Sequence, residues 1–83
     1  MLEAEEAWLV DWFRRRNTNI GDTPDLEMVD ADYFDKNFID SFGVIELVAE
    51  AEEHFGVRFT ELDFQDRRFS TVWGLAQIIR SKR

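Results

Sequence analysis

The chain has 83 residues, which suits one small domain, because a single hydrophobic core usually organises about 100 to 200 residues. Ten Lys and Arg residues stand against 18 Asp and Glu, a formal net charge of −8, so nucleic-acid phosphates and anionic lipid headgroups repel the protein. Hydrophobic residues make up 45% of the chain and Cys is absent, which excludes a disordered acidic tail, a disulfide framework and a thiolate zinc site.

The first predicted helix covers residues 3–16, where apolar side chains recur at helical spacing. Leu9 and Phe13 lie four residues apart, and Trp8 and Trp12 flank them. Acidic residues at the start of this segment and three arginines at its end complement the helix macrodipole.

The start of the chain is acidic, and its apolar runs are far shorter than the roughly 20 residues of a membrane span. We therefore expect a cytoplasmic, monomeric protein whose single domain covers residues 1–83, with no membrane span and no nucleic-acid partner.

Residues 17–39 contain Gly21, Pro24 and scattered Asp without a sustained period. This composition predicts a long connection. We expect it to contain at most a short helical turn near residues 26–29. Long connections in compact domains need apolar anchors. The candidate anchors are Ile20, Leu26, Met28, Tyr33, Phe34, Phe38 and Ile39.

The second main helix is predicted to begin at Asp40 or Ser41, both preferred N-caps, and to stop at Gly56, which suits a left-handed C-cap. Apolar residues follow the i, i+3, i+4, i+7 rule along this segment. They are Val44, Leu47, Val48, Ala51 and Phe55.

Two further helices are predicted near the end of the chain. Thr60 caps a short one that ends between Phe64 and Arg67, and Ser70 or Thr71 caps the last one. The last helix carries its apolar stripe at Val72, Leu75, Ala76 and Ile79, with Trp73 on the polar side. The sequence thus predicts an all-α, four-helix bundle of three main antiparallel helices and one short helix, with a long loop between the first two.

The sequence lacks the residues needed for a nucleophile–base pair or a phosphate-binding loop, so we expect that the protein is not an enzyme. His54 is the only imidazole, no thiol exists, and no glycine-rich loop precedes a helix. His54 is interpreted as a cation at the negative end of its helix. A calcium loop beginning at Asp30 fails, because Asp35 occupies the glycine position and Ser41 the bidentate acid position. We expect no metal site.

Ser41 and a stripe of carboxylates are the features that invite a functional interpretation. Glu46, Glu50 and Glu53 share one face of the second main helix, although like charges at that spacing repel one another. An ordinary N-cap and an ordinary solvated face would explain both features. Alternatively, a hydroxyl at a helix start suits a phosphate ester, because free N–H groups and the positive dipole end stabilise the anion.

Three segments resemble one protein family. Residues 40–48 resemble the Asp-Ser-Leu segment that opens the second helix of acyl carrier proteins and peptidyl carriers. Residues 52–57 resemble the end of that helix, and residues 69–72 resemble the hydrophobic-x-Thr-Val start of the family's last helix. The resemblance covers roughly residues 32–79, in the family's order and spacing.

The chain departs from the carriers of fatty-acid synthesis at several positions. Phe42 and Gly43 follow the serine, where those carriers usually have Leu, and Phe38 and Ile39 replace their preceding Leu-Gly-Ala. Residues 39–43 and 63–67 look closer to D-alanyl carrier proteins and to stand-alone carriers of specialised pathways, such as surface polysaccharide or secondary-metabolite biosynthesis.

By this resemblance, Ser41, preceded by Asp40, would receive 4′-phosphopantetheine from coenzyme A through a phosphopantetheinyl transferase. The terminal thiol of that arm would hold an acyl or aminoacyl group as a thioester. A loading ligase or transferase and a downstream acyltransferase would then be the partners.

Glu46, Glu50 and Glu53 would meet basic patches of these partners, and Phe42 and Ile45 would supply apolar contacts, with core packing as the alternative for both. An unmodified helical adaptor that binds a basic protein stays open as a second function, and a small acid-base enzyme as a third.

Overall fold

A computed structural model describes residues 2–16 and 24–83, and these residues form helices without a strand. An isolated bridge joins Asp32 to Thr71. The elements in chain order are α1 (Ala4–Arg16), α2 (Asp25–Asp30), α3 (Ser41–Phe55), α4 (Glu61–Gln65), the 3-10 helix η2 (Arg67–Ser70) and α5 (Val72–Lys82). The predicted all-α fold with three long helices is confirmed.

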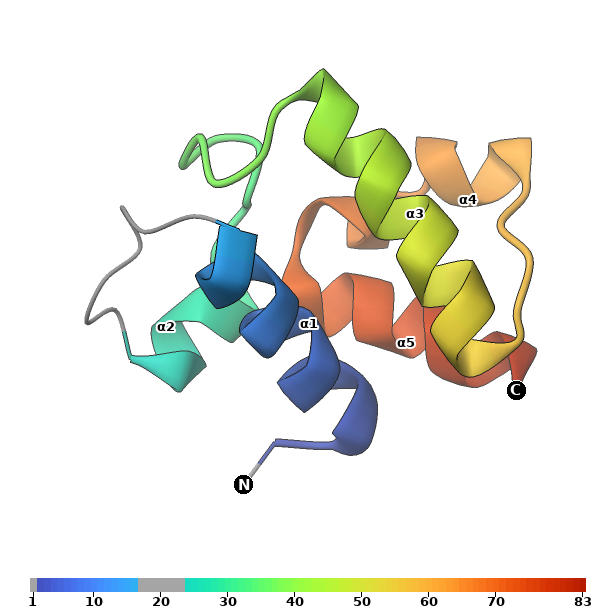
Figure 1. The fold of residues 1–83 in the computed structure, drawn as a ribbon, viewed down its shortest axis with the longest axis horizontal. Coiled ribbons are helices and arrows are strands. Elements are labelled where there is room, and N and C mark those ends of the chain that lie inside the picture. The colour runs from blue at the N-terminus through green and yellow to red at the C-terminus, as the bar shows by residue number, and fades with distance from the viewer. Residues whose placement is uncertain (1, 17–23) are drawn as a thin grey trace.

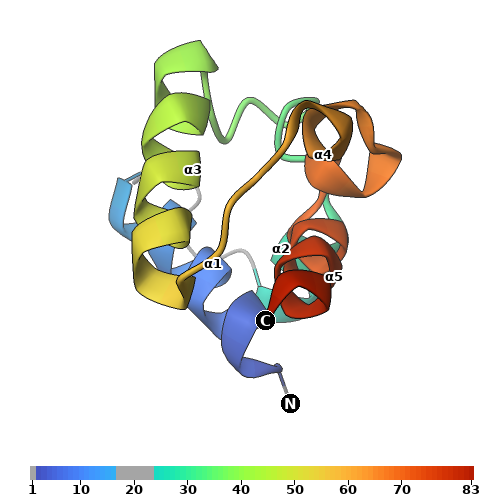
Figure 2. The same cartoon turned by 90° about the vertical axis from the view of Figure 1, so that its right-hand side faces the viewer.

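The three long helices α1, α3 and α5 surround the core. α1 and α3 run in roughly opposite directions, whereas α5 lies across the molecule (Figure 1). After the quarter turn of Figure 2, α3 stands at one side and α4 with α5 at the other, and residues 56–60 cross between them. This arrangement leaves the outer face of α3 uncovered by any described helix.

The predicted apolar stripes face the core. In α3, Leu47 and Ala51 have no exposed surface, and Val44, Val48 and Phe55 pack against the core from partly buried positions. The predicted stripe of α5 is fully buried, while Trp73 is 50% exposed, as its place on the polar side of that helix predicts. The burial of apolar side chains in these stripes is the main force that holds the helices together.

Side-chain caps fix where the helices begin. Asp40 is the N-cap of α3 and its Oδ1 accepts a hydrogen bond from the Gly43 N–H at 2.7 Å, so Ser41 is the first residue of the helix rather than its cap. Thr71, not Ser70, caps α5. Gly56 ends α3 in the left-handed conformation, at φ 68°, which confirms the predicted C-cap.

The connection between α1 and α3 contains more structure than the sequence predicts. Its helical part, α2, covers Asp25–Asp30 rather than a single turn at residues 26–29. Among the candidate anchors, Met28 and Tyr33 are buried, each 1% exposed, but Leu26 is 73% exposed and anchors nothing. The interpretation of Leu26 is wrong because the short α2 has room for one buried face, and Met28 and Val29 occupy it.

The other candidate anchors differ in how far they are buried. Phe38 and Ile39 are partly buried against the core, whereas Phe34 is 42% exposed. Ile20 lies outside the described residues.

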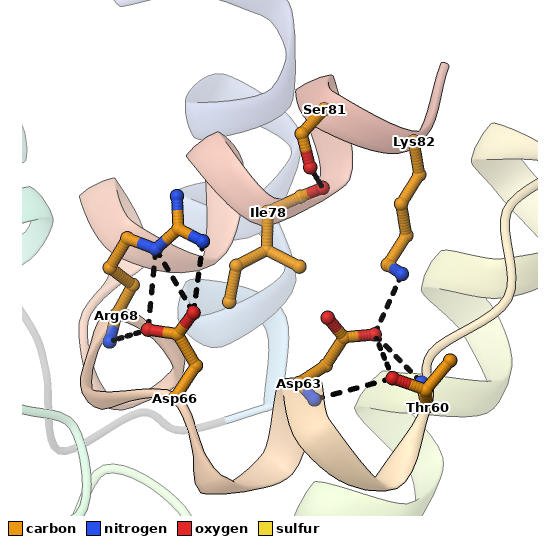
Figure 3. A network of polar contacts seen from close by, with 7 residues as sticks. All are labelled: Thr60, Asp63, Asp66, Arg68, Ile78, Ser81 and Lys82. Carbon is orange, nitrogen blue, oxygen red and sulfur yellow. Dashed lines mark hydrogen bonds and ion pairs between the residues drawn. The ribbon is translucent and has the colours of Figure 1, made fainter.

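A polar network ties the start of α4 to the end of α5, and a separate pair joins Asp66 to Arg68 in η2 (Figure 3). Thr60 and Asp63 form a capping box at the start of α4, and Lys82 of α5 contacts Asp63 at 2.7 Å. Partial burial disfavours the charged carboxylate, but the Lys82 ammonium and the hydrogen bonds from Thr60 hold the pKa of Asp63 below its ordinary value. The short helix therefore ends at Gln65, ahead of the 3-10 turn, and its start is fixed to α5.

The buried hydroxyl of Tyr33 makes no hydrogen bond to a described residue. The Tyr33 ring packs against Phe13 and Phe34, at centroid distances of 5.0 and 4.9 Å. Burial, together with the charge of Asp32, raises the pKa of Tyr33 above its ordinary value, so the hydroxyl stays protonated.

We predict that Tyr33→Phe raises the free energy of unfolding by about 1 kcal/mol, because the substitution keeps the ring and removes an unsatisfied buried hydroxyl. Urea unfolding of the two proteins measures the difference. A clear loss of stability in the variant would show that the hydroxyl has a hydrogen-bond partner in solution.

Candidate functional site

The start of α3 presents Ser41 to solvent. Ser41 is the first residue of the helix, and its side chain is exposed. Asp40 holds the first turn in place through its bond to the Gly43 N–H. Among the described residues, no acceptor faces the N–H groups of Ser41 and Phe42. These free donors and the helix dipole can stabilise an anionic ester on Ser41, so the residues present fit a phosphate-bearing group.

Two large apolar side chains lie exposed beside Ser41. Phe42 is 76% exposed and Ile45 is 67% exposed, and both belong to the first half of α3. Core packing, the alternative for both residues, is therefore wrong. Single exposed apolar side chains are ordinary on protein surfaces, and here two of them lie at one end of an uncovered helix.

Three contacts join α3 to α1 at regular intervals. Arg16 forms an ion pair with Glu46 at 2.7 Å, and the Trp12 Nε1–H donates to Glu50 Oε2 at 3.0 Å. The ring of Trp8 stacks on His54, with centroids 5.1 Å apart and planes 20° apart. We call these three pairs the α1–α3 seam.

The seam has an antiparallel register. Its members advance four residues at a time along α3 and retreat four at a time along α1, so each pair lies one helical turn from the next. The Arg16 guanidinium also lies over the Trp12 ring, 4.9 Å from its centroid, which couples two neighbouring pairs. A single helix face of α1 therefore holds one edge of α3.

The seam changes the interpretation of the acidic stripe. Glu46 and Glu50 each contact α1, whereas Glu53 makes no ion pair or hydrogen bond with a described residue. The sequence of α3 alone suggested three equivalent carboxylates. The structure shows that they differ in their contacts with α1. The matching spacing of Trp8, Trp12 and Arg16 in α1 was a signal that could have revealed the pairing.

An open hollow of about 290 Å³ lies between the end of α1 and the start of α3. Its apolar lining includes Trp12, Ile39 and Gly43, and its polar lining includes Arg16, Asn37 and Asp40. Gly43 permits the close approach of Ile39, because a Cβ at Gly43 would lie 2.7 Å from Ile39 Cγ1. The sequence does not indicate this hollow, because the hollow depends on how the connection folds back on α3.

The described residues offer little for metal binding or membrane insertion. They contain no group of three metal-ligating side chains, and the Asp32 carboxylate instead accepts from the N–H groups of Phe34 and Asp35 within its own turn. No helix in the described segments has the length and apolar character to cross a bilayer.

The comparisons with known proteins identify the family of the chain. Residues 15–79 match the family described as the phosphopantetheine attachment site. This match covers most of the chain, so the protein belongs to that family of phosphopantetheine-carrying domains, which confirms the resemblance to carrier proteins. The family's domain is the attachment site of covalent 4′-phosphopantetheine, the cofactor of this protein. Comparisons with curated proteins and with solved structures found no significant match.

We predict that the Trp12–Glu50 pair of the seam contributes about 1 kcal/mol to folding, as a hydrogen bond to a charged but partly solvated acceptor. A double-mutant cycle with Trp12→Phe and Glu50→Ala, measured by urea unfolding, gives the coupling energy. The matched control replaces Glu53, which should show no coupling to Trp12. Equal coupling for Glu50 and Glu53 would contradict the seam.

Proposed function

We propose that this protein is a non-catalytic carrier that holds an acyl or aminoacyl intermediate of a specialised pathway on 4′-phosphopantetheine attached to Ser41. The observation that carries the proposal is the exposed Ser41 hydroxyl at the Asp40-capped start of α3, in a chain of the phosphopantetheine attachment family. When bound, the cofactor supplies the thiol that this Cys-free chain lacks, and that thiol holds the cargo as a thioester.

Ser41 accepts the arm from coenzyme A on a phosphopantetheinyl transferase. Its hydroxyl oxygen forms the new bond to phosphorus, the nucleotide part of coenzyme A leaves with the old bridging oxygen, and the hydroxyl proton passes to a base of the transferase or to water. The free N–H groups of Ser41 and Phe42 then face the ester, while Asp40 keeps the first turn of the helix intact. Ser41 contributes a positioned nucleophile, and the transferase contributes the catalysis.

The outer face of α3 is the proposed surface for the transferase, for a loading ligase or transferase, and for a downstream acyltransferase. Phe42 and Ile45 offer exposed apolar contact area next to the attachment residue. Glu53 offers an unshared charge, and Glu46 and Glu50 add carboxylates that α1 partly neutralises. Such charge-assisted surfaces favour fast association and easy release, which suits a shuttle between enzymes.

Within the family, a D-alanyl carrier for cell-wall polymer modification is the alternative, on the likeness of residues 39–43 and 63–67 to those carriers. An unmodified adaptor for a basic protein is the alternative outside it. The cytoplasmic location, the monomeric state and the single-domain organisation stay predictions from the sequence.

The proposal predicts that incubation with coenzyme A and a broad-specificity phosphopantetheinyl transferase adds one phosphopantetheine mass to the intact protein. Ser41→Ala should remove the addition and leave the circular dichroism spectrum unchanged, because the Ser41 side chain is exposed. Ser81→Ala is the matched control and should be modified normally. An unmodified wild-type protein after several transferases, with Ser41 intact, would favour the adaptor.

For the partner surface, we predict that Ile45→Ala slows loading at subsaturating concentration by about three- to tenfold, a typical loss for a contacting apolar side chain. Stability should change little, because Ile45 is 67% exposed. Leu26→Ala, on α2, removes a similarly exposed leucine and serves as the control. Equal loading rates for the wild type, Ile45→Ala and Leu26→Ala would show that Ile45 is not part of the partner surface.

A further inference from the structure

The hollow between the end of α1 and the start of α3 adjoins the attachment residue. Asp40 lines it, and Ser41 follows Asp40 directly, so the anchor lies one residue from its rim. Its volume of about 290 Å³ is at the lower end of the roughly 300 to 1,000 Å³ of small-molecule sites. The hollow therefore suits one section of a chain-like ligand rather than a whole cofactor.

The charges around the hollow are already engaged. Arg16 pairs with Glu46 and covers the Trp12 ring, and Asp40 accepts the Gly43 N–H at the helix start. An anionic occupant would have to displace Glu46 from Arg16, and a cationic occupant would have to compete for the Asp40 carboxylate. A neutral occupant meets no such cost.

The remaining lining combines apolar surface with one amide. The apolar part comes from Trp12, Phe38, Ile39 and Gly43. Asn37 provides a side chain that both donates and accepts hydrogen bonds. Asn37 has a left-handed backbone, at φ 58°, a conformation that few residues other than Gly, Asn and Asp adopt. The fitting occupant is neutral, carries amides and has a small branched apolar group.

We infer that the hollow is a resting site for the pantetheine section of the protein's own arm. That section is uncharged, has two amides and a hydroxyl, and bears two methyl groups on one carbon close to the phosphate. The methyl groups match the surface of Trp12 and Ile39, and the amides match Asn37. This inference rests on the proposed attachment at Ser41 and assigns the arm a place between α1 and α3.

The tether makes such a site effective even when its intrinsic affinity is weak. A short flexible linker holds its ligand at an effective concentration in the millimolar range, so a site with a dissociation constant of about 1 mM would be occupied much of the time. A partner could still withdraw the arm, because so weak a contact opposes release by little.

The test is an NMR experiment on the loaded protein. Carbon-13- and nitrogen-15-labelled protein is modified with unlabelled coenzyme A, and isotope-filtered spectra then detect proton contacts between arm and protein. We expect cross-peaks from the arm's paired methyl groups to the Trp12 ring and to Ile39, together with shift changes at Asn37 and Gly43. Asn37→Gly, which tolerates the left-handed backbone, should lose these cross-peaks, whereas Gln65→Ala should keep them.

Each other outcome overturns the inference in a recognisable way. Cross-peaks to Phe42 or Leu62, or none at all, on a protein that carries the arm would place it elsewhere and leave the proposed function intact. Cross-peaks that survive in Asn37→Gly would show that Asn37 does not hold the amides of the arm, which contradicts the proposed fit. Failure of Ser41 to accept the arm, seen first by intact mass, would overturn the proposed function and this inference together.

Discussion

The α1–α3 seam is the constraint on which the exposed face of α3 depends. α3 buries few of its side chains completely, and Leu47 and Ala51 are its fully buried apolar residues. Contacts of Arg16 and Trp12 with Glu46 and Glu50, one turn apart, act together with this apolar burial to set the rotation of α3 about its own axis. That rotation turns the polar edge of α3 toward α1 and leaves the face with Phe42 and Ile45 open to solvent. Adjacent faces of α3 thus serve folding and the proposed contact with partners.

The same constraint shapes the surroundings of Ser41. Arg16 ends α1 beside the start of α3, and Ile39 folds against Gly43, which has no side chain to prevent the approach. Ser41, the proposed attachment residue, consequently stands between an exposed apolar surface, at Phe42, and a half-polar hollow. Under the proposed function, the exposed apolar surface would meet partner enzymes and the hollow would hold the arm between transfers.

Local sequence was sufficient for the features that depend on one helix at a time. The stripe of α5, the Gly56 C-cap and the Thr60 cap follow from periodicity and capping preferences. The resemblance of residues 40–48 to carriers predicts Ser41 as the attachment residue, and the structure places its side chain in solvent. Features that join distant segments were not predicted. The engagement of Glu46 and Glu50 by α1, the exposure of Leu26 and the orphaned Tyr33 hydroxyl depend on how helices are rotated against one another, which propensities do not encode.

The central claim is that Ser41 carries the arm when the protein works in its own cells. The most direct measurement is the mass of the protein purified from its own host, followed by fragmentation of the peptide that contains Ser41. The account predicts a phosphopantetheine group on Ser41, with or without an additional acyl or aminoacyl mass. Native protein that consistently carries an unmodified Ser41, or an arm on a different residue, would contradict the account.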